Sequence, residues 1–214
     1  MRALVACEFS GRIRDELIAL GVDAVSCDLL PTEKEGPHYQ GDVRDILYDG
    51  WDMMVAHPPC TTISKAGVRW LHSDPKRWLQ LAKDCEFFNE LLRAPIPKMI
   101  IENPIPHRYA TEQLDRKYDQ IIHPWQHGHL FTKATCLWLK NVDPIKPTNN
   151  VKKEMMKYSQ KEIQKIIAVS GWNVAKRKKQ RSITCQGIAK ALASQLAVKT
   201  SADNPQLRKQ LSIW

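Results

Sequence analysis

Short apolar runs alternate with helical stretches through the first 101 residues, and this alternation restricts the fold more than any other feature. Strands are predicted at residues 3–6, 22–27, 52–56 and 98–101, and helices at 13–20 and 75–93. Later runs at 121–122 and 135–139 predict two more strands. Strands separated by helices form a mostly parallel sheet with helices on its faces, so we expect an α/β doubly wound domain.

The composition fits one globular domain that stays in a reducing compartment. The chain has 214 residues, of which 43% are hydrophobic, and no apolar run is long enough to cross a bilayer. The sequence opens with strand-like residues and not with a signal peptide, so a cytoplasmic location is expected. Six cysteines are scattered without a Cys-x-x-Cys pair, which does not favour a disulfide scaffold or a zinc ribbon.

Positive charge is concentrated in one segment. The formal net charge is +9, and residues 151–181 contain ten basic and two acidic residues, whereas the first 150 residues are close to neutral. Such a segment is typical of a surface that contacts nucleic-acid phosphates, although a solvated helix face gives the same pattern. The predicted contact residues are Lys152, Lys153, Arg177, Lys178, Lys179 and Arg181.

Polar residues follow the predicted strands where a doubly wound sheet collects its ligands. Asp28 ends the second strand, where an acid can accept hydrogen bonds from a ribose; a turn or capping acid is the alternative. Asp42 could accept from an adenine amine, or cap the turn that follows it. The first turn contains Gly11 but lacks G-x-G-x-x-G, so a pyrophosphate loop is not indicated.

Cys60 and Glu102 follow two other strands. Cys60 comes after two prolines on a stiff loop, where a thiolate stabilised by His57, Lys65, Arg69 or a helix N-terminus could act as a nucleophile. Glu102 would lie across the same crevice. A thiol and a carboxyl group there suit addition to an aromatic heterocycle, although a buried cysteine and an N-capping glutamate remain the alternatives.

A zinc site is a weaker possibility. The segment HPWQHGH contains His123, His127 and His129, and Cys136 follows. Standard ligand spacings are missing, so packing and backbone hydrogen bonds explain these residues more simply.

These motifs, taken in order, resemble a known family. Phe9-Ser10-Gly11, Asp28, Gly41-Asp42-Val43, Pro58-Pro59-Cys60 and Glu102-Asn103 are similar to motifs of the S-adenosylmethionine-dependent DNA cytosine-C5 methyltransferases, particularly the small phage-type versions. The resemblance covers most of the chain. It implies a Rossmann-like sheet of the methyltransferase type, S-adenosylmethionine as cofactor, DNA as partner, and a bacterial or phage-infected cell as location.

The resemblance also implies roles for individual residues. Phe9 would pack on the adenine, Asp28 would hold the ribose and Asp42 the adenine amine. Ser10 and Gly11 would shape the methionine pocket, with Leu29, Val43 and Pro58 as further cofactor contacts. Cys60 would attack cytosine C6 while Glu102 holds or protonates N3. Lys133 would replace the Arg-x-Arg strand, which is missing, and a helix at 184–196 would return to the cofactor site.

Other features depart from the larger members of the family. Pro-Cys-Gln is Pro-Cys-Thr here, Glu-Asn-Val is Glu-Asn-Pro, and no target-recognition domain is present. We therefore expect a catalytic core at 1–140, a basic segment at 141–181, and a closing helix plus tail at 182–214. The substrate stays open between duplex DNA, a single strand and a free cytidine nucleotide. A donor of a larger group and a non-catalytic DNA-binding or inhibitor protein are further alternatives.

Overall fold

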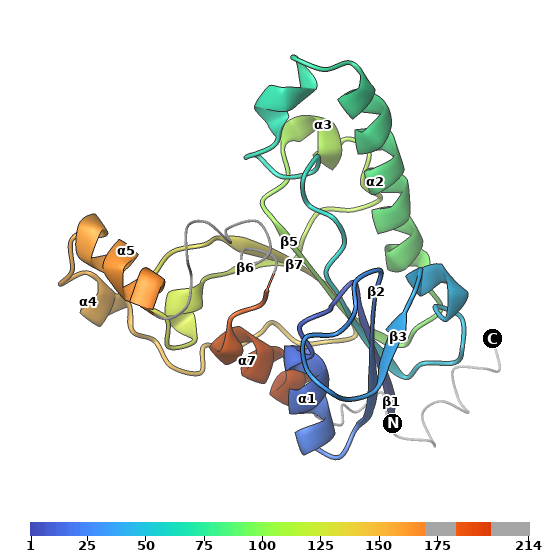
Figure 1. Cartoon of the computed structure of the whole chain (residues 1–214), viewed down its shortest axis with the longest axis horizontal. Coiled ribbons are helices and arrows are strands. Elements are labelled where there is room, and N and C mark those ends of the chain that lie inside the picture. The colour runs from blue at the N-terminus through green and yellow to red at the C-terminus, as the bar shows by residue number, and fades with distance from the viewer. Residues whose placement is uncertain (170–182, 198–214) are drawn as a thin grey trace.

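A seven-stranded sheet forms the centre of the computed structural model, which describes residues 1–169 and 183–197 (Figure 1). The strand order is β3-β2-β1-β4-β5-β7-β6. The strands span Arg2–Ala6 (β1), Asp23–Asp28 (β2), His38–Gln40 (β3), Met53–Ala56 (β4), Lys98–Pro104 (β5), Gln120–Ile122 (β6) and Thr135–Lys140 (β7).

Helices cover both faces of this sheet. β1 to β5 pair in parallel, and β7 runs antiparallel to both β5 and β6. The α-helices are Arg12–Ala19 (α1), Lys76–Arg93 (α2), Arg108–Thr111 (α3), Lys152–Met155 (α4), Gln160–Val169 (α5) and Gln186–Leu196 (α7), and the 3-10 turns are Val43–Asp45 (η1), Val68–Leu71 (η2) and Pro124–Gln126 (η3). The expected doubly wound α/β architecture is confirmed.

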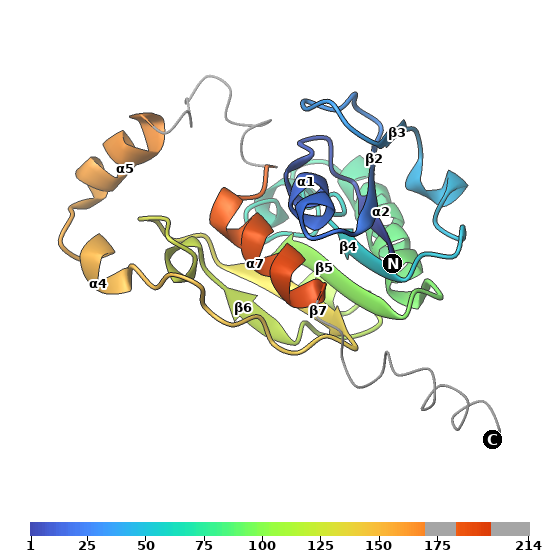
Figure 2. The ribbon, with the colours of Figure 1, turned by 90° about the horizontal axis from the view of Figure 1, so that it is seen from below.

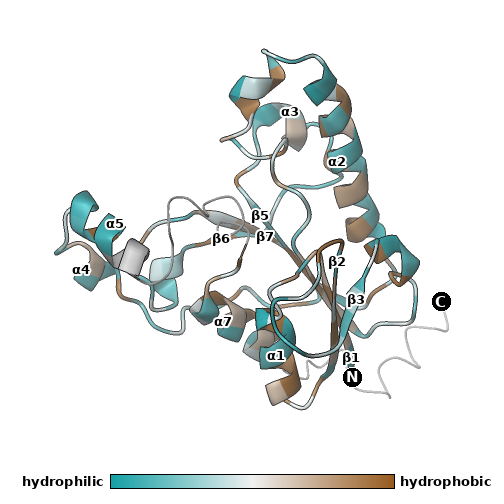
Figure 3. Ribbon diagram, in the orientation of Figure 1, coloured by the Kyte–Doolittle hydropathy of each residue, from teal (hydrophilic) through white to brown (hydrophobic). Residues whose placement is uncertain are grey.

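Alternation along the central strands divides the core into two layers. On β1, Leu4 and Ala6 face the layer that contains α2, whereas Ala3 and Val5 face α1 and α7. Successive side chains of a strand point to opposite faces, so a strand covered on both sides is apolar throughout. Figure 2 shows α1 and α7 together on one side of the sheet, and Figure 3 shows the central strands among the most hydrophobic parts of the ribbon.

The sheet differs from the sequence-based expectation at β5 and β7. The strand predicted to end at Ile101 continues to Pro104, so Glu102 and Asn103 lie inside β5. The cause is the antiparallel β7, which pairs Glu102 with Leu137 and Asn103 with Cys136 beyond the point where β4 ends. Glu102 therefore sits on a strand that is held in place on one edge.

The predicted C-terminal helix is present as α7. Its buried side chains include Ile188, Leu192 and Leu196. It packs against α1, and Arg12 donates a hydrogen bond of 2.9 Å to the carbonyl of Thr184 just before it. Among the described residues, no helix has the length and apolarity needed to cross a membrane.

Candidate functional site

A cavity of about 740 Å³ opens at the carboxyl ends of β1, β2 and β4. Its size lies in the range of small-molecule sites. Six of the predicted cofactor residues line it: Phe9, Ser10, Asp28, Leu29, Asp42 and Val43. The exposed fraction of Leu29 is 73%, which leaves a large apolar side chain at this cavity for a ligand to cover.

The two acids at this cavity also stabilise local turns. The carboxylate of Asp28 accepts a hydrogen bond of 2.9 Å from the amide of Leu30, and that of Asp42 accepts one of 3.0 Å from the amide of Arg44. Each carboxylate has further acceptor capacity, so capping and ligand binding are compatible. Burial raises the pKa of Asp28, and the hydrogen bond from Leu30 offsets this only in part.

Glu8 is a cavity residue without a role in the sequence-based interpretation. It is 5% exposed, and its Oε1 accepts hydrogen bonds of 2.6 Å from the Ser10 hydroxyl and 3.2 Å from the amide of Ile13. Its Oε2 is buried and has no hydrogen-bond partner among the described residues. A buried carboxylate oxygen is stabilised by a cation or a donor, so Glu8 offers a ligand one strong acceptor.

Arg14 holds the loop that follows β2, whose first residues, Leu29 and Leu30, line the cavity. Its side chain is fully buried and donates hydrogen bonds of 3.1 and 3.0 Å to the carbonyls of Lys34 and Glu35. Gly11 adopts φ +69°, and a Cβ at this position would lie 2.6 Å from the Arg14 guanidinium. Gly11 does not line the cavity. It forms the left-handed turn at the start of α1, where the Arg14 guanidinium leaves no room for a side chain.

The loop after β4 connects the cavity to Cys60. His57 and Pro59 line the cavity, whereas Pro58 lies beside it and its carbonyl accepts a hydrogen bond of 2.9 Å from Asn103. Cys60 follows directly and is half-buried. The bond from Asn103 ties this loop to β5 beside Glu102.

The other cysteines are poor nucleophiles. Cys7 and Cys27 also line the cavity, but burial and the charge of Asp28 raise the pKa of both thiols, that of Cys27 to about 12. Burial likewise raises the thiol pKa of Cys85, Cys136 and Cys185. A thiol with a raised pKa supplies little thiolate, which argues against these five cysteines as nucleophiles.

Glu102 forms a buried pair with His57. Their Nδ1 and Oε2 atoms lie 3.0 Å apart, and the side chains are 8% (His57) and 15% (Glu102) exposed. A carboxylate only accepts, so Nδ1 of His57 carries the proton. Burial alone would raise the pKa of Glu102, but the hydrogen bond from His57 and the charge of Lys133 hold this pKa below its usual value. The predicted residues Glu102 and Lys133 therefore lie close together.

The histidine segment forms no metal site. Nε2 of His129 accepts a hydrogen bond of 3.0 Å from the amide of Gly187, and Nδ1 of His127 lies 3.0 Å from the Thr148 hydroxyl. Within residues 1–169 and 183–197, no group of three or more histidine, cysteine or acidic side chains is arranged to hold a metal ion. His127 and His129 instead connect their loop to neighbouring segments.

The predicted nucleic-acid contacts fall on α4 and beyond it. Lys152 and Lys153 are exposed on α4, and the Lys152 ammonium lies 5.1 Å from the centre of the Trp125 ring on η3. Figure 2 shows α4 and α5 at one end of the molecule. Arg177, Lys178, Lys179 and Arg181 lie outside the described residues.

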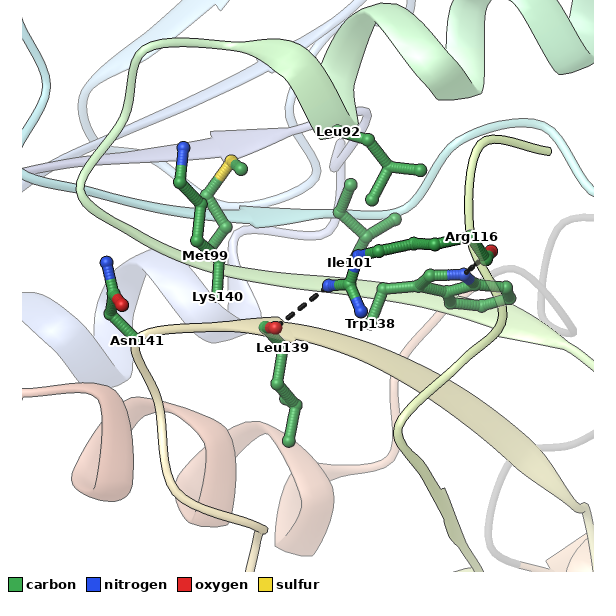
Figure 4. Close-up of a pocket in the computed structure, with 8 residues that line it drawn as sticks. All are labelled: Leu92, Met99, Ile101, Arg116, Trp138, Leu139, Lys140 and Asn141. Atoms are coloured by element: carbon green, nitrogen blue, oxygen red, sulfur yellow. Dashed lines mark hydrogen bonds between the residues drawn. The ribbon is translucent and has the colours of Figure 1, made fainter.

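A second cavity, of about 300 Å³, lies near the start of β5 and the end of β7 (Figure 4). Trp138 and Ile101 contribute apolar surface, and Arg116 donates a hydrogen bond of 2.8 Å to the carbonyl of Leu139. Its lining contains no carboxylate and no thiol. This cavity therefore offers none of the groups that the predicted chemistry requires.

Comparison with known proteins gives matches among solved structures only. No protein-family model and no curated protein matches the chain. A prophage-encoded protein from E. coli, described as a DNA modification methyltransferase, aligns over 65% of this chain and 46% of its own length, at 13% identity and a TM-score of 0.43. A methyltransferase of Entamoeba histolytica aligns over 68% of this chain and 54% of its own, at 15% identity and a TM-score of 0.40. The Dnmt2 methyltransferase of S. pombe aligns over 65% and 48%, at 14% identity and the same TM-score.

The chain thus spans about half the length of these structures. Its own sheet, with five parallel strands and the antiparallel β7 between β5 and β6, is a doubly wound, Rossmann-like arrangement. The expected fold class is therefore confirmed.

Proposed function

We propose that this protein is an S-adenosylmethionine-dependent methyltransferase that modifies C5 of cytosine in DNA, with Cys60 as the nucleophile. One arrangement supports the proposal above all others. The cavity between Asp28 and Asp42 reaches His57 and Pro59, directly before Cys60, and Glu102 is bonded to that same loop through His57. A nucleoside cofactor and a pyrimidine would then meet at one loop.

The cavity residues fit the cofactor. Asp28 would accept hydrogen bonds from the ribose hydroxyls, Asp42 would accept from the adenine amine, and Phe9 would pack on the adenine. The unpartnered Oε2 of Glu8 suits the ammonium group of the methionine part. When bound, the cofactor would supply an electrophilic methyl group.

The remaining groups would act on the base. As the Cys60 thiol gives up its proton and its sulfur adds to C6, Glu102 would relay a proton to N3, which draws electron density from C6 toward N3. C5 would become nucleophilic and gain the methyl group. The C5 proton would then pass to water, N3 would return its proton to Glu102, the C5=C6 bond would re-form, and the C6–S bond would break to release the thiolate. Lys133 would stabilise negative charge beside Glu102.

The proposal is tested by incubating the protein with methyl-labelled S-adenosylmethionine and, separately, single-stranded DNA, duplex DNA and dCMP, followed by nucleoside mass spectrometry. We expect 5-methylcytosine in DNA, and its loss in Cys60→Ala. Label in dCMP alone would assign a free nucleotide as substrate. Cofactor binding with no transfer to any substrate would contradict the proposed activity.

Cys85→Ala is the matched control for the thiol. Cys85 is buried on α2 and lines neither cavity, so its loss should lower stability modestly and leave methyl transfer in place. Equal loss of transfer in both variants would show that cysteine removal acts through folding and not through the chemistry.

A further inference from the structure

Two cation–aromatic pairs lie on the surface next to the Cys60 loop. The Arg69 guanidinium lies 4.6 Å from the centre of the Trp70 ring, and the Arg108 guanidinium lies 4.6 Å from that of Tyr109. The exposed fraction of Trp70 is 49%, and Arg69 and Arg108 are exposed. We call Arg69, Trp70, Arg108, Tyr109 and the exposed Lys65 the cation–aromatic rim. Arg69 and Trp70 lie on η2 and Arg108 and Tyr109 on α3, which Figure 1 shows beside α2.

The charged residues within the rim's two segments are all cations, and Asp74, Glu102 and Glu112 lie at the borders of these segments. Residues 60–73 and 103–111 contain three lysines or arginines and no aspartate or glutamate. None of the rim residues lines either cavity. A half-exposed tryptophan beside these cations is therefore explained neither by the core nor by the candidate cofactor site.

The two segments of the rim are fixed to each other. The amide of Lys65 donates a hydrogen bond of 3.0 Å to the carbonyl of Ile105, and Nε2 of His107 lies 2.6 Å from the carbonyl of Thr62. The rings of Trp78 and Tyr109 meet edge to face at a centroid distance of 5.0 Å. These contacts hold the rim in one geometry before any partner binds.

A continuous series of turns connects the rim to Cys60. The amide of Ser64 donates to the carbonyl of Cys60 at 2.9 Å, that of Gly67 donates to Ser64 at 2.9 Å, and that of Trp70 donates to Gly67 at 3.1 Å. A Cβ on Gly67 would collide with the carbonyl oxygen of Thr61, so this close packing requires glycine. A strand held on the rim would therefore have a fixed position relative to Cys60.

We infer that the rim binds a single-stranded nucleic acid, with an unpaired base stacked on Trp70 and the backbone phosphates held by Arg69, Lys65 and Arg108. Aromatic faces bind bases without regard to sequence, and cations beside them follow the backbone. In a paired duplex the faces of the interior bases are stacked on one another, so they are not accessible to Trp70. The inference rests on the proposed function only for its class of partner, because binding at the rim requires no cofactor and no thiol.

The test is fluorescence anisotropy with a labelled single-stranded DNA and a duplex of the same sequence, performed in the Cys60→Ala background so that no chemistry occurs. The single strand should bind more tightly. Trp70→Ala should weaken its binding by roughly 5- to 100-fold, since one stacked base contributes on that order. Arg69→Ala should weaken it and reduce the salt dependence.

Tyr48→Ala and Lys117→Ala are matched controls, because they remove an exposed aromatic ring and an exposed cation outside the rim. Both should bind DNA as the parent does. Preference for the duplex, or unchanged binding in Trp70→Ala, would overturn the inference. Strong binding that depends on Trp70, in a protein that methylates nothing, would support the rim and contradict the methyltransferase proposal instead.

Discussion

The cofactor side and the substrate side of the candidate site hold their carboxylates differently. Asp28 and Asp42 are partly exposed, and each accepts a hydrogen bond from a local backbone amide at the edge of a large cavity. Glu102 is mostly buried and bonded to His57 from a neighbouring strand. The cofactor side, here called the open side, has acids that a ligand can reach in place of water. The substrate side, called the closed side, holds Glu102 in one orientation. Changes on the open side should therefore affect affinity, and changes on the closed side should affect rate and stability.

The largest difference between the sides should come from the His57–Glu102 pair. We expect Glu102→Gln and His57→Gln each to lower the methyl-transfer rate by roughly 100- to 10,000-fold, the range for loss of a positioned proton donor or its partner. Cofactor affinity should change less than about twofold in Glu102→Gln, because Glu102 does not line the cofactor cavity, whereas His57→Gln alters a residue of that cavity and should also lower the affinity. Single-turnover kinetics and calorimetric titration of the cofactor would measure the two effects.

The double variant shows whether the two residues act as one unit. If they do, its rate should be close to that of either single variant. Fully additive losses would indicate two independent roles. Glu112→Gln, at an exposed acid, is the matched control, and circular dichroism would establish that each variant is folded.

Asp28→Asn should have a smaller effect, confined to affinity. Loss of a charged acceptor for the ribose should raise the cofactor Kd about 10-fold, while the rate at saturating cofactor stays within about threefold. Asp23→Asn changes the same residue type at the opposite end of β2 and should leave the Kd unchanged. A large fall in the rate of Asp28→Asn at saturating cofactor would show that the open side also affects the chemical step, which would contradict the proposed difference between the two sides.

Sequence patterns predict those strands whose own residues carry a clear apolar pattern. β1, β2, β4 and β5 are apolar runs that end at polar residues, and all were predicted. β3 was not, because His38, Tyr39 and Gln40 form a short edge strand with no apolar periodicity. The antiparallel direction of β7 has no local signal, since it depends on which strands it meets in the folded sheet.

The candidate site divides in the same way. Asp28 and Asp42 could be proposed from their places after strands, where parallel sheets gather their ligands. The pairing of His57 with Glu102 joins residues 45 positions apart and depends on the register of β4 and β5. Arg14 lies in a short helix among the charged residues Arg12, Asp15 and Glu16, so nothing local distinguishes it from a surface arginine, although it is fully buried.

The smallest effect should be a change in how stability depends on pH. Because His57 and Lys133 hold the pKa of Glu102 below its usual 4.5, ionised Glu102 stabilises the fold at pH values above 4.5. This contribution is lost as the pH falls below 4.5 through the pKa of the folded state. The free energy of unfolding of Glu102→Gln should therefore approach that of the parent protein on acidification. Urea unfolding between pH 7 and pH 3, with Glu112→Gln as control, would measure it. A gap between Glu102→Gln and the parent that stays constant over this range would mean that the closed side stabilises the fold through packing and not through charge.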